Sequence, residues 1–308
     1  MDTTGHLSVQ GRPAATPHIT LGGTEPSFTH PAKWRETIDP FSLGYHGFRP
    51  EEILGYPHAG NDVFHVRGTI DEKPVRAYIK SARQKERNFL TEVKLLSQLD
   101  DPIFPRVLDY DKEHGSFSVT EELPGLRLSV IVGENLTMES LSYMEEYGEA
   151  LSRIHAMTPD TGTQKDRKFY HTPPADLLKE LNLSHLEGFF ATNKPKDGVT
   201  VFCHGDCHYA NILWQDHHIS GILDFELSGY GDRDFDIAWT VFLRPGQKFF
   251  KTEEEVEAFL RGYGKHGQCH PKSVRYYMAQ CYIYFLHSCG EDEAYGSYIR
   301  DWLNKYCK

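Results

Sequence analysis

The stretch "FCHGDCHYANILW", residues 202–214, decides how the rest of this chain is interpreted. It places two cysteines, two histidines, an aspartate and an asparagine within thirteen positions. Side chains of these types support three different chemistries: zinc binding through sulfur and nitrogen, nucleophilic attack by a thiolate, or magnesium-dependent chemistry through oxygen. The spacing of the residues separates the three.

Four side chains of the stretch carry atoms that zinc prefers: Cys203, His204, Cys207 and His208. Structural zinc sites usually take two ligands from one turn and two from a distant second turn. No second Cys/His pair with such spacing follows in the sequence. A zinc site is therefore not favoured.

A catalytic thiol is the second possibility, because Cys207 has histidines close to it in the sequence. Nothing marks the third group that would orient such a histidine. The cysteines of the chain also form no C-x-x-C pair, so we expect free thiols in a reducing compartment. The six cysteines are Cys203, Cys207, Cys269, Cys281, Cys289 and Cys307.

The third possibility uses the oxygen-bearing residues Asp206, Asn211 and Asp224, the last in "GILDFE". Magnesium is a hard ion that takes carboxylate and amide oxygens, and nucleotide phosphates supply further ligands. If Asn211 and Asp224 hold the ion, Asp206 is free to orient an acceptor hydroxyl and to accept its proton. The same order and spacing of Asp, Asn and Asp occurs in protein kinases.

The segments "HGDCHYANIL", "GILDFE" and "GDRDFDIAW" together closely resemble the motifs of the aminoglycoside phosphotransferase family, which includes choline-kinase-like enzymes. The resemblance covers the chain from about Leu54 to the C-terminus. It implies an α+β, protein-kinase-like bilobal fold, with a small antiparallel-sheet N-lobe carrying one helix and a larger, mainly helical C-lobe. It also implies a role for each of five residues: Asp206 as catalytic base, Asn211 and Asp224 as metal ligands, and His204 and Asp236 as supports of the loop.

A kinase-like N-lobe needs a strand lysine that holds the nucleotide phosphates and a helix glutamate that orients it. "RAYIKSA" supplies Lys80, and the following helical pattern supplies Glu92, with Glu86 as the alternative. Backbone amides around Gly60 and Asn61, in the turn "HAGND", are predicted to contact phosphate.

The segment "FSVTEELPG" is expected to link the two lobes. Backbone groups near Glu122 and Leu123 are then predicted to bind the purine edge. The predicted division of the chain is an N-terminal extension over 1–50, an N-lobe over 51–124 and a C-lobe over 125–308.

Alternation of apolar and polar residues predicts a β-hairpin over 62–82, and helical periodicity predicts a helix over 85–101. Two further strands are expected on either side of "DKEHG". Longer helical patterns cover 138–157, 176–190 and the tail from 252.

The composition limits the kinds of partner that this protein is expected to bind. A formal charge of −11 argues against a nucleic-acid partner and suits a cationic ligand, for which Glu226 is a candidate contact. No apolar run is long enough for a membrane helix, and the start "MDTTGHLSVQGRPAATPH" has no secretory pattern, so a cytoplasmic protein is expected. His155, in "LSRIHAM", is interpreted as a packing or hydrogen-bonding residue. The oligomeric state is left open.

The leading hypothesis is a kinase that uses ATP (or GTP) and Mg²⁺ to phosphorylate a hydroxyl of a small molecule, such as an aminoglycoside or another antibiotic. Metabolic kinases of choline, ethanolamine, homoserine or methylthioribose would use the same catalytic residues. A nucleotide-binding pseudokinase is less favoured because Lys80, Asp206, Asn211 and Asp224 are all present. A protein kinase is disfavoured because little room for an activation segment follows Asp224.

Overall fold

The computed structural model describes residues 38–57, 61–82, 89–133, 137–247, 249–288 and 292–308. These residues form two compact units. The first unit contains the described residues up to Ser97 together with Pro105–Glu122, and the second contains Gln98–Phe104 and Leu123–Lys308. No helix in the described ranges is both long and apolar enough to cross a membrane.

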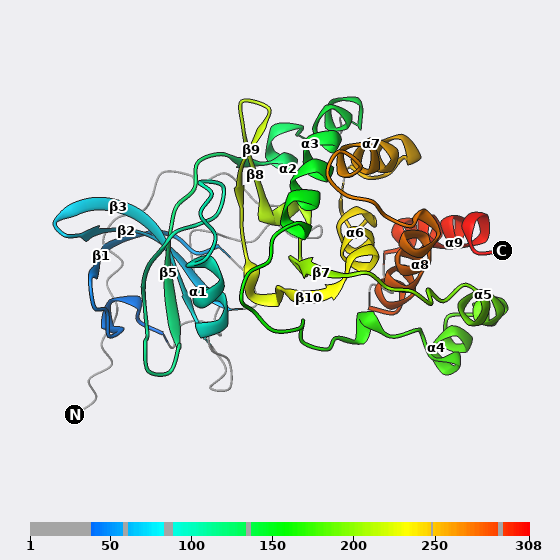
Figure 1. Cartoon of the computed structure of the whole chain (residues 1–308), viewed down its shortest axis with the longest axis horizontal. Coiled ribbons are helices and arrows are strands. Elements are labelled where there is room, and N and C mark those ends of the chain that lie inside the picture. The colour runs from blue at the N-terminus through cyan, green and yellow to red at the C-terminus, as the bar shows by residue number, and fades with distance from the viewer. Residues whose placement is uncertain (1–37, 58–60, 83–88, 134–136, 248, 289–291) are drawn as a thin grey trace. The chain divides into compact units, whose positions relative to one another are not determined.

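The first unit is built on a five-stranded antiparallel sheet with the spatial order β1-β2-β3-β5-β4 (Figure 1). The predicted hairpin is confirmed as β2 and β3, joined at Asp71 and Glu72, which both have positive φ (46° and 63°) as a tight hairpin turn requires. The strands are β1 (Phe48–Gly55), β2 (Asp62–Ile70), β3 (Lys73–Ser81), β4 (Val107–Tyr110) and β5 (Phe117–Glu121).

Side chains that alternate along the strands form the core of this unit. The buried members of the core are Phe48, Tyr56, Phe64, Val66, Ala77, Ile79, Phe117 and Val119. The predicted helix is shorter than expected: α1 covers only Leu90–Leu96, and residues 83–88 lie outside the described ranges.

The sheet begins earlier than the predicted boundary after residue 50, which falls inside β1. The buried carboxylate of Asp109 accepts hydrogen bonds from the amides of His46, Gly47 and Phe48 at 2.8, 2.8 and 2.9 Å. These three hydrogen bonds hold residues 46–48, where the chain enters β1, to Asp109 on β4. This earlier start of the sheet could not be predicted from the sequence, because Asp109 lies about sixty positions after the residues that it contacts. Of the predicted extension, residues 1–37 lie outside the described ranges.

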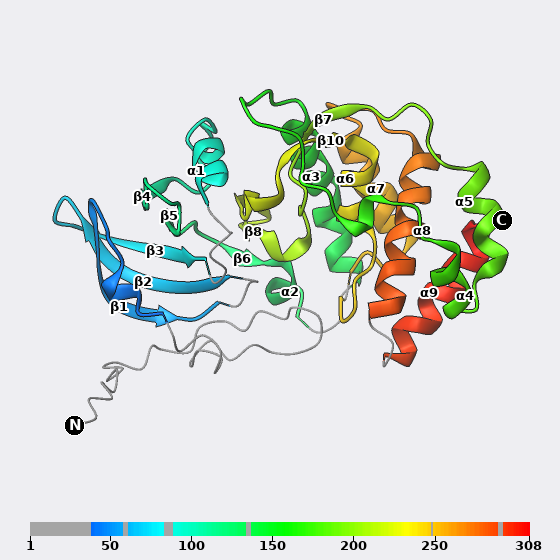
Figure 2. The same cartoon turned by 90° about the horizontal axis from the view of Figure 1, so that it is seen from below.

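The second unit contains a three-stranded sheet, a two-stranded ribbon and most of the helices (Figure 2). The sheet has the order β6-β8-β9, and β7 pairs with β10. The strands are β6 (Leu126–Arg127), β7 (Thr200–Cys203), β8 (Ile212–Gln215), β9 (His218–Ile222) and β10 (Gly229–Asp232). The helices are α2 (Leu128–Ile131), α3 (Thr137–His155), α4 (Ala175–Glu180), α5 (Glu187–Thr192), α6 (Arg233–Val241), α7 (Glu253–Tyr263), α8 (Pro271–Ser288) and α9 (Glu293–Tyr306).

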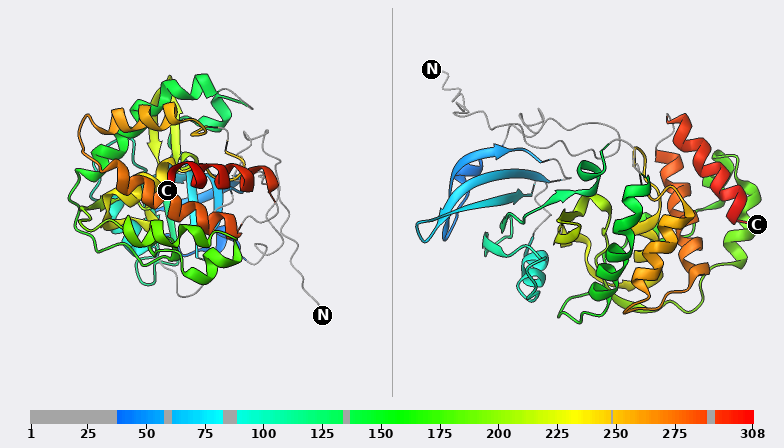
Figure 3. Two further views of the ribbon diagram at one scale, coloured as in Figure 1. Left: turned by 90° about the vertical axis from the view of Figure 1, so that its right-hand side faces the viewer. Right: turned by 90° about the horizontal axis from the view of Figure 1, so that it is seen from above.

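The long helix α3 and the helical tail, α7 to α9, agree with the predicted patterns, and α8 and α9 lie side by side (Figure 3). The prediction of one continuous helix over 176–190 is wrong. The backbone at Asn182 takes φ 58°, which ends α4 and separates it from α5. A left-handed residue cannot continue a right-handed helix, and asparagine tolerates this conformation.

Close approach of α3 and α7 depends on glycine. A Cβ atom at Gly262 would lie 1.8 Å from the carbonyl oxygen of Glu145, and one at Gly148 would lie 1.9 Å from that of Phe259. Neither backbone could remain in place with a larger residue. This packing fixes the C-terminal part of α3, which carries His155 at its end.

Candidate active site

The stretch 202–214 forms the connection between β7 and β8 in the second unit. β7 ends at Cys203, a single 3-10 turn covers Tyr209–Asn211, and β8 begins at Ile212. Asp206 lies in the irregular segment between these elements. We call residues 204–211 the catalytic loop.

His204 joins the catalytic loop to the strand β9. Its Nδ1 accepts a hydrogen bond from the Asp206 amide (3.2 Å), so Nε2 carries the proton and donates to the carbonyl of Leu223 (3.0 Å). Burial lowers the pKa of His204 and keeps the ring neutral. His204, the residue predicted to support the loop, therefore connects the backbone of Asp206 to that of Leu223.

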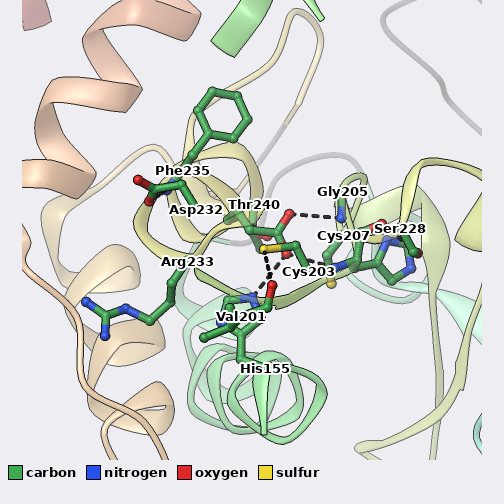
Figure 4. Close-up of polar contacts among 12 residues, drawn as sticks. His155, Val201, Cys203, Gly205, Cys207, Ser228, Asp232, Arg233, Phe235 and Thr240 are labelled. Atoms are coloured by element: carbon green, nitrogen blue, oxygen red, sulfur yellow. Dashed lines mark hydrogen bonds and ion pairs between the residues drawn. The ribbon is translucent and has the colours of Figure 1, made fainter. Parts of the chain in front are cut away.

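Asp236, on α6, is the centre of a buried hydrogen-bond network beneath the loop. Its carboxylate accepts from the amides of His204 (3.0 Å) and Gly205 (2.9 Å). It also lies 3.1 Å from Nε2 of His155, whose Nδ1 lies 2.8 Å from the hydroxyl of Tyr263. Figure 4 shows His155 and Gly205 at this point. Two helices, α3 and α7, therefore hold the loop through Asp236, and His155 is a hydrogen-bonding residue as predicted.

The carboxylate of Asp206 is fixed in orientation but open to solvent on one side, with 21% of the side chain exposed. Oδ1 accepts a 2.8 Å hydrogen bond from Nε1 of Trp239, and Oδ2 lies 3.6 Å from Nε2 of His208. Burial alone raises the pKa of Asp206. The hydrogen bond and charge of His208, the charge of Arg244 and the Trp239 hydrogen bond outweigh burial, and the pKa lies well below its usual range. Asp206 is therefore an ionised carboxylate ready to accept a hydrogen bond.

Asn211 and Asp224 are brought together by the pairing of β8 with β9. Ile212 pairs with Ile222, and the Leu223 amide donates to the Asn211 carbonyl (2.8 Å), so Asp224 follows directly after the residue opposite Asn211. The Asn211 side chain donates from Nδ2 to the Asp206 carbonyl (2.9 Å), which fixes its amide and directs its oxygen away from that contact. One carboxylate and one amide oxygen are a donor set that fits Mg²⁺.

Two arginines lie close to Asp206 from segments outside the catalytic loop. Nη1 of Arg167 donates to the Gly205 carbonyl (2.8 Å), and the guanidinium carbon lies 4.3 Å from the centre of the Trp239 ring. Arg244 is buried and donates to the Trp239 carbonyl. Its positive charge partly balances the carboxylate of Asp206.

The sequence alone did not indicate Trp239, Arg167 or Arg244. It also did not indicate that His208 is a partner of Asp206. Trp239 could have been found, because it follows Asp236 by three positions and so lies on the same face of α6. Arg167 and Arg244 carry no such signal, since each lies outside any recognisable pattern.

The two thiols of residues 202–214 are buried, although Cys207 directly follows Asp206 and Cys203 lies near Asp236. Burial raises the pKa of Cys203 and of Cys207, so both remain thiols. Cys203, His155 and Asp236 lie close enough to hold a metal ion, but both ring nitrogens of His155 are already engaged in hydrogen bonds. The described cysteines are free, as predicted, and Cys289 lies outside the described residues.

In the first unit, Lys80 lies on β3, between β2 and β5, with Nζ 3.0 and 3.2 Å from the two carboxylate oxygens of Glu92. This is the predicted strand-lysine and helix-glutamate pair. The alternative partner, Glu86, and the loop residue Gly60 lie outside the described ranges. Asn61 is buried at the start of β2.

The predicted purine-binding segment follows β5. The amide of Glu122 donates to the Arg76 carbonyl (3.0 Å), and its carboxylate lies 3.0 Å from Nε2 of His65. Because that amide is already used within the sheet, the Glu122 carbonyl and the Leu123 backbone are the better candidates for contact with a base. Glu226 lies in the 3-10 turn Phe225–Leu227, directly after Asp224, and is half-buried.

The fold and the catalytic loop define a kinase-like phosphotransferase. The chain matches the model of the phosphotransferase enzyme family over residues 55–276 and belongs to that family. The enzyme is accordingly a phosphotransferase. The predicted family and the predicted α+β, protein-kinase-like fold are both confirmed.

Individual relatives agree with this assignment. An aminoglycoside 3'-phosphotransferase of Niallia circulans is 26% identical over 243 residues, which cover 73% of this chain and 88% of that enzyme. Amicoumacin kinase hAmiN, solved with AMP-PNP and Ca²⁺, is 18% identical with a TM-score of 0.57 over 85% of this chain and 90% of its own. Macrolide 2'-phosphotransferase MphH of Brachybacterium faecium is 20% identical with a TM-score of 0.53 over 84% and 92%. The two structures are similar to this chain in fold.

Proposed function

We propose that this phosphotransferase transfers the γ-phosphoryl group of ATP, or of GTP, to a hydroxyl of a small molecule in a magnesium-dependent reaction. One observation carries the proposal: Asp206 is a partly exposed carboxylate with a lowered pKa, its backbone carbonyl is bound by the side chain of Asn211, and Asp224 directly follows the residue that pairs with Asn211. This arrangement suits an acceptor hydroxyl on one side and a metal-bound nucleotide on the other.

The reaction is a simple exchange of bonds. The acceptor oxygen bonds to the γ-phosphorus as the bond from that phosphorus to the bridging oxygen of ADP breaks. The hydroxyl proton leaves toward Asp206 or solvent, and the products are a phosphate monoester, ADP and a proton. Because the pKa of Asp206 is low, it is a weak base, and its main contribution is to orient the hydroxyl.

The remaining residues have supporting roles in this proposal. Asn211 and Asp224 would hold Mg²⁺, which when bound neutralises charge on the phosphate oxygens. Lys80, oriented by Glu92, would bind the nucleotide phosphates, helped by the amide of Asn61. The backbone near Glu122 and Leu123 would bind the purine.

A small acceptor is favoured over a protein substrate. Only one 3-10 turn and the strand β10 separate Asp224 from α6, and β10 is paired with β7. A protein kinase needs a longer activation segment at this place. The names of the relatives make hydroxyl-bearing antibiotics the first class of acceptor to test. Choline, ethanolamine, homoserine and methylthioribose are the alternatives, because the same catalytic residues would serve them.

The test is to incubate the full chain with Mg²⁺ and ATP against aminoglycosides, macrolides, other hydroxyl-bearing antibiotics and the four metabolic alcohols. ADP release and product mass are followed together. A gain of one phosphate on any compound supports the proposal and identifies the acceptor. Magnesium-dependent ATP binding with no phosphorylated product would favour a regulatory pseudokinase instead.

A further inference from the structure

We infer that Arg167 is a positioning residue, whose guanidinium group connects the backbone directly before Asp206 to the ring that binds the Asp206 carboxylate. The inference rests on the proposed function, because it concerns how Asp206 is kept in place to orient an acceptor hydroxyl. It assigns a role to a residue between α3 and α4, outside the catalytic loop itself.

Four residues form a closed cycle of contacts around the catalytic carboxylate. Nη1 of Arg167 donates to the carbonyl of Gly205 (2.8 Å), the residue directly before Asp206. Oδ1 of Asp206 accepts a hydrogen bond from Nε1 of Trp239 (2.8 Å). The cycle closes where the guanidinium carbon of Arg167 lies 4.3 Å from the centre of the Trp239 ring. One guanidinium group therefore contacts both the backbone before Asp206 and the ring that fixes its side chain.

The backbone at Gly205 determines where Asp206 lies. Gly205 takes φ 82°, a conformation that glycine adopts without strain, and a Cβ atom there would lie 2.2 Å from the carbonyl oxygen of Leu227. Its amide donates to the carboxylate of Asp236 (2.9 Å), and its carbonyl accepts from Arg167. Hydrogen bonds on both sides thus fix the direction in which the chain enters Asp206, and Arg167 provides the one on the carbonyl side.

The segment that carries Arg167 is itself held in two places. Before Arg167, the chain forms a parallel bridge with β10, in which the amide of Gln164 donates to the carbonyl of Tyr230 (3.0 Å). After Arg167, Nε2 of Gln280 on α8 donates to the carbonyl of Phe169. Because its backbone is held within three residues in both directions, Arg167 can transmit a fixed position to the catalytic loop.

The guanidinium group acts through its position more than through its charge. Burial raises the pKa of Asp206, and the groups that lower it most are His208, Arg244 and Trp239. Arg167 is half-buried, so solvent partly screens its charge. A guanidinium group can stack on a ring with its flat face and donate a hydrogen bond in its own plane, which the ammonium group of lysine cannot do. Arg167→Lys would therefore keep the charge and lose the connection.

Three variants of the full chain separate position from charge. Arg167→Met removes the charge and the donors, and Arg167→Lys keeps the charge. Arg300→Met is the matched control, because Arg300 on α9 is also half-buried and donates from Nη1 to a carbonyl, that of Leu181 (2.9 Å). Amide exchange of residues 204–211 is measured by mass spectrometry, and binding of magnesium-ATP by calorimetry. ADP release is followed with the compound that accepts phosphate in the test of the proposed function, or with water as acceptor where none does.

We expect amide exchange of residues 204–211 to become about tenfold faster in Arg167→Met, because one charge-assisted hydrogen bond is lost. ADP release should fall about 10–100-fold, while the dissociation constant of magnesium-ATP stays within about threefold. A general loss of structure would not separate turnover from nucleotide affinity in this way. Arg167→Lys should recover only a small part of either effect, and Arg300→Met should match wild type.

Two results of the exchange and turnover measurements overturn the inference while the proposed function stands. The first is unchanged exchange of residues 204–211 in folded Arg167→Met, or unchanged ADP release despite faster exchange. The second is full recovery in Arg167→Lys, because charge alone would then be sufficient. Absence of ADP release by wild type, with every acceptor and with water, overturns the proposed function instead, and the exchange measurement still decides whether Arg167 holds the catalytic loop.

Discussion

Nε1 of Trp239 donates a 2.8 Å hydrogen bond to Oδ1 of Asp206. One oxygen of the carboxylate is thereby directed into the protein, and the other, Oδ2, lies 3.6 Å from Nε2 of His208 and is the oxygen proposed to meet the acceptor hydroxyl. Trp239 is held on α6, one turn after Asp236, which supports the backbone of the same loop. A single helix thus fixes both the course of the catalytic loop and the orientation of its carboxylate.

The Trp239→Phe substitution keeps an aromatic ring in contact with Phe169 and Phe242 and removes the N–H donor. We expect kcat to fall about tenfold with nucleotide affinity unchanged, because the carboxylate loses its fixed orientation and one charge-assisted hydrogen bond. The loss of a donor also raises the pKa of Asp206 from its depressed position, although the carboxylate stays ionised at neutral pH. The matched control is Trp302→Phe on α9, whose ring makes a tilted contact with Tyr282 (4.9 Å between ring centres) and none with Asp206 among the contacts described. An unchanged kcat in folded Trp239→Phe would contradict this role.

The Asp206→Asn substitution deletes the carboxylate without removing either proposed metal ligand. Turnover should fall by about 10²–10⁴-fold, while the dissociation constant of magnesium-ATP, measured by calorimetry, stays within a factor of about three. Thermal unfolding provides the check that the variant is folded. Near-normal turnover in the folded variant would exclude Asp206 as the acceptor-orienting residue.

The Asp224→Ala substitution should behave differently, because it removes an oxygen donor proposed for the metal ion. We expect weaker binding of magnesium-ATP together with loss of turnover, and chelation of wild type by EDTA should reproduce both effects. Partial recovery at high Mg²⁺ would distinguish a ligand from a purely structural residue. Unchanged magnesium dependence in this variant would be incompatible with the proposed metal site.

The double substitution of Cys203→Ser and Cys207→Ser tests the zinc-binding and catalytic-thiol chemistries that residues 202–214 also suggested. Both thiols are buried and protonated, so kcat should remain within about threefold of wild type. The melting temperature should fall by several degrees, because two hydroxyls replace buried thiols. Complete loss of activity in a folded protein would restore the zinc or thiol hypotheses.

Glu149 on α3 makes the stability of the fold depend on pH. Hydrogen bonds from Lys265, His266 and Arg153 lower its pKa to about 2. The unfolded chain therefore takes up a proton first as the pH falls, and the stabilising contribution, complete above about 4.5, is lost toward pH 2. Glu149→Gln should reduce the free energy of unfolding by up to about 1 kcal/mol at pH 7. In urea unfolding the difference should vanish near pH 2, and a difference that grows with acidity would contradict the assignment.

The amino-acid sequence by itself determined the elements whose partners are close along the chain. The hairpin of β2 and β3 follows from alternation and a two-residue turn, and the Asn211–Asp224 juxtaposition follows from the short hairpin of β8 and β9. Asp206 was recognisable because its loop is a compact motif. The pair of Lys80 and Glu92 was also predictable, since strand and helix are consecutive.

The tertiary structure alone decided the surroundings of Asp206. Trp239, Arg167 and Arg244 come from segments that lie more than thirty positions away from it, and no local pattern relates them. The same holds for Asp109, which fixes the start of β1 from a distant strand. Hydrogen bonding along neighbouring strands is a local property that residue order encodes, whereas the charge and desolvation around a carboxylate depend on distant segments that meet only in the folded chain. For this reason the sequence identified the phosphotransferase family and the catalytic loop, and the fold determined the charge and hydrogen bonding around Asp206.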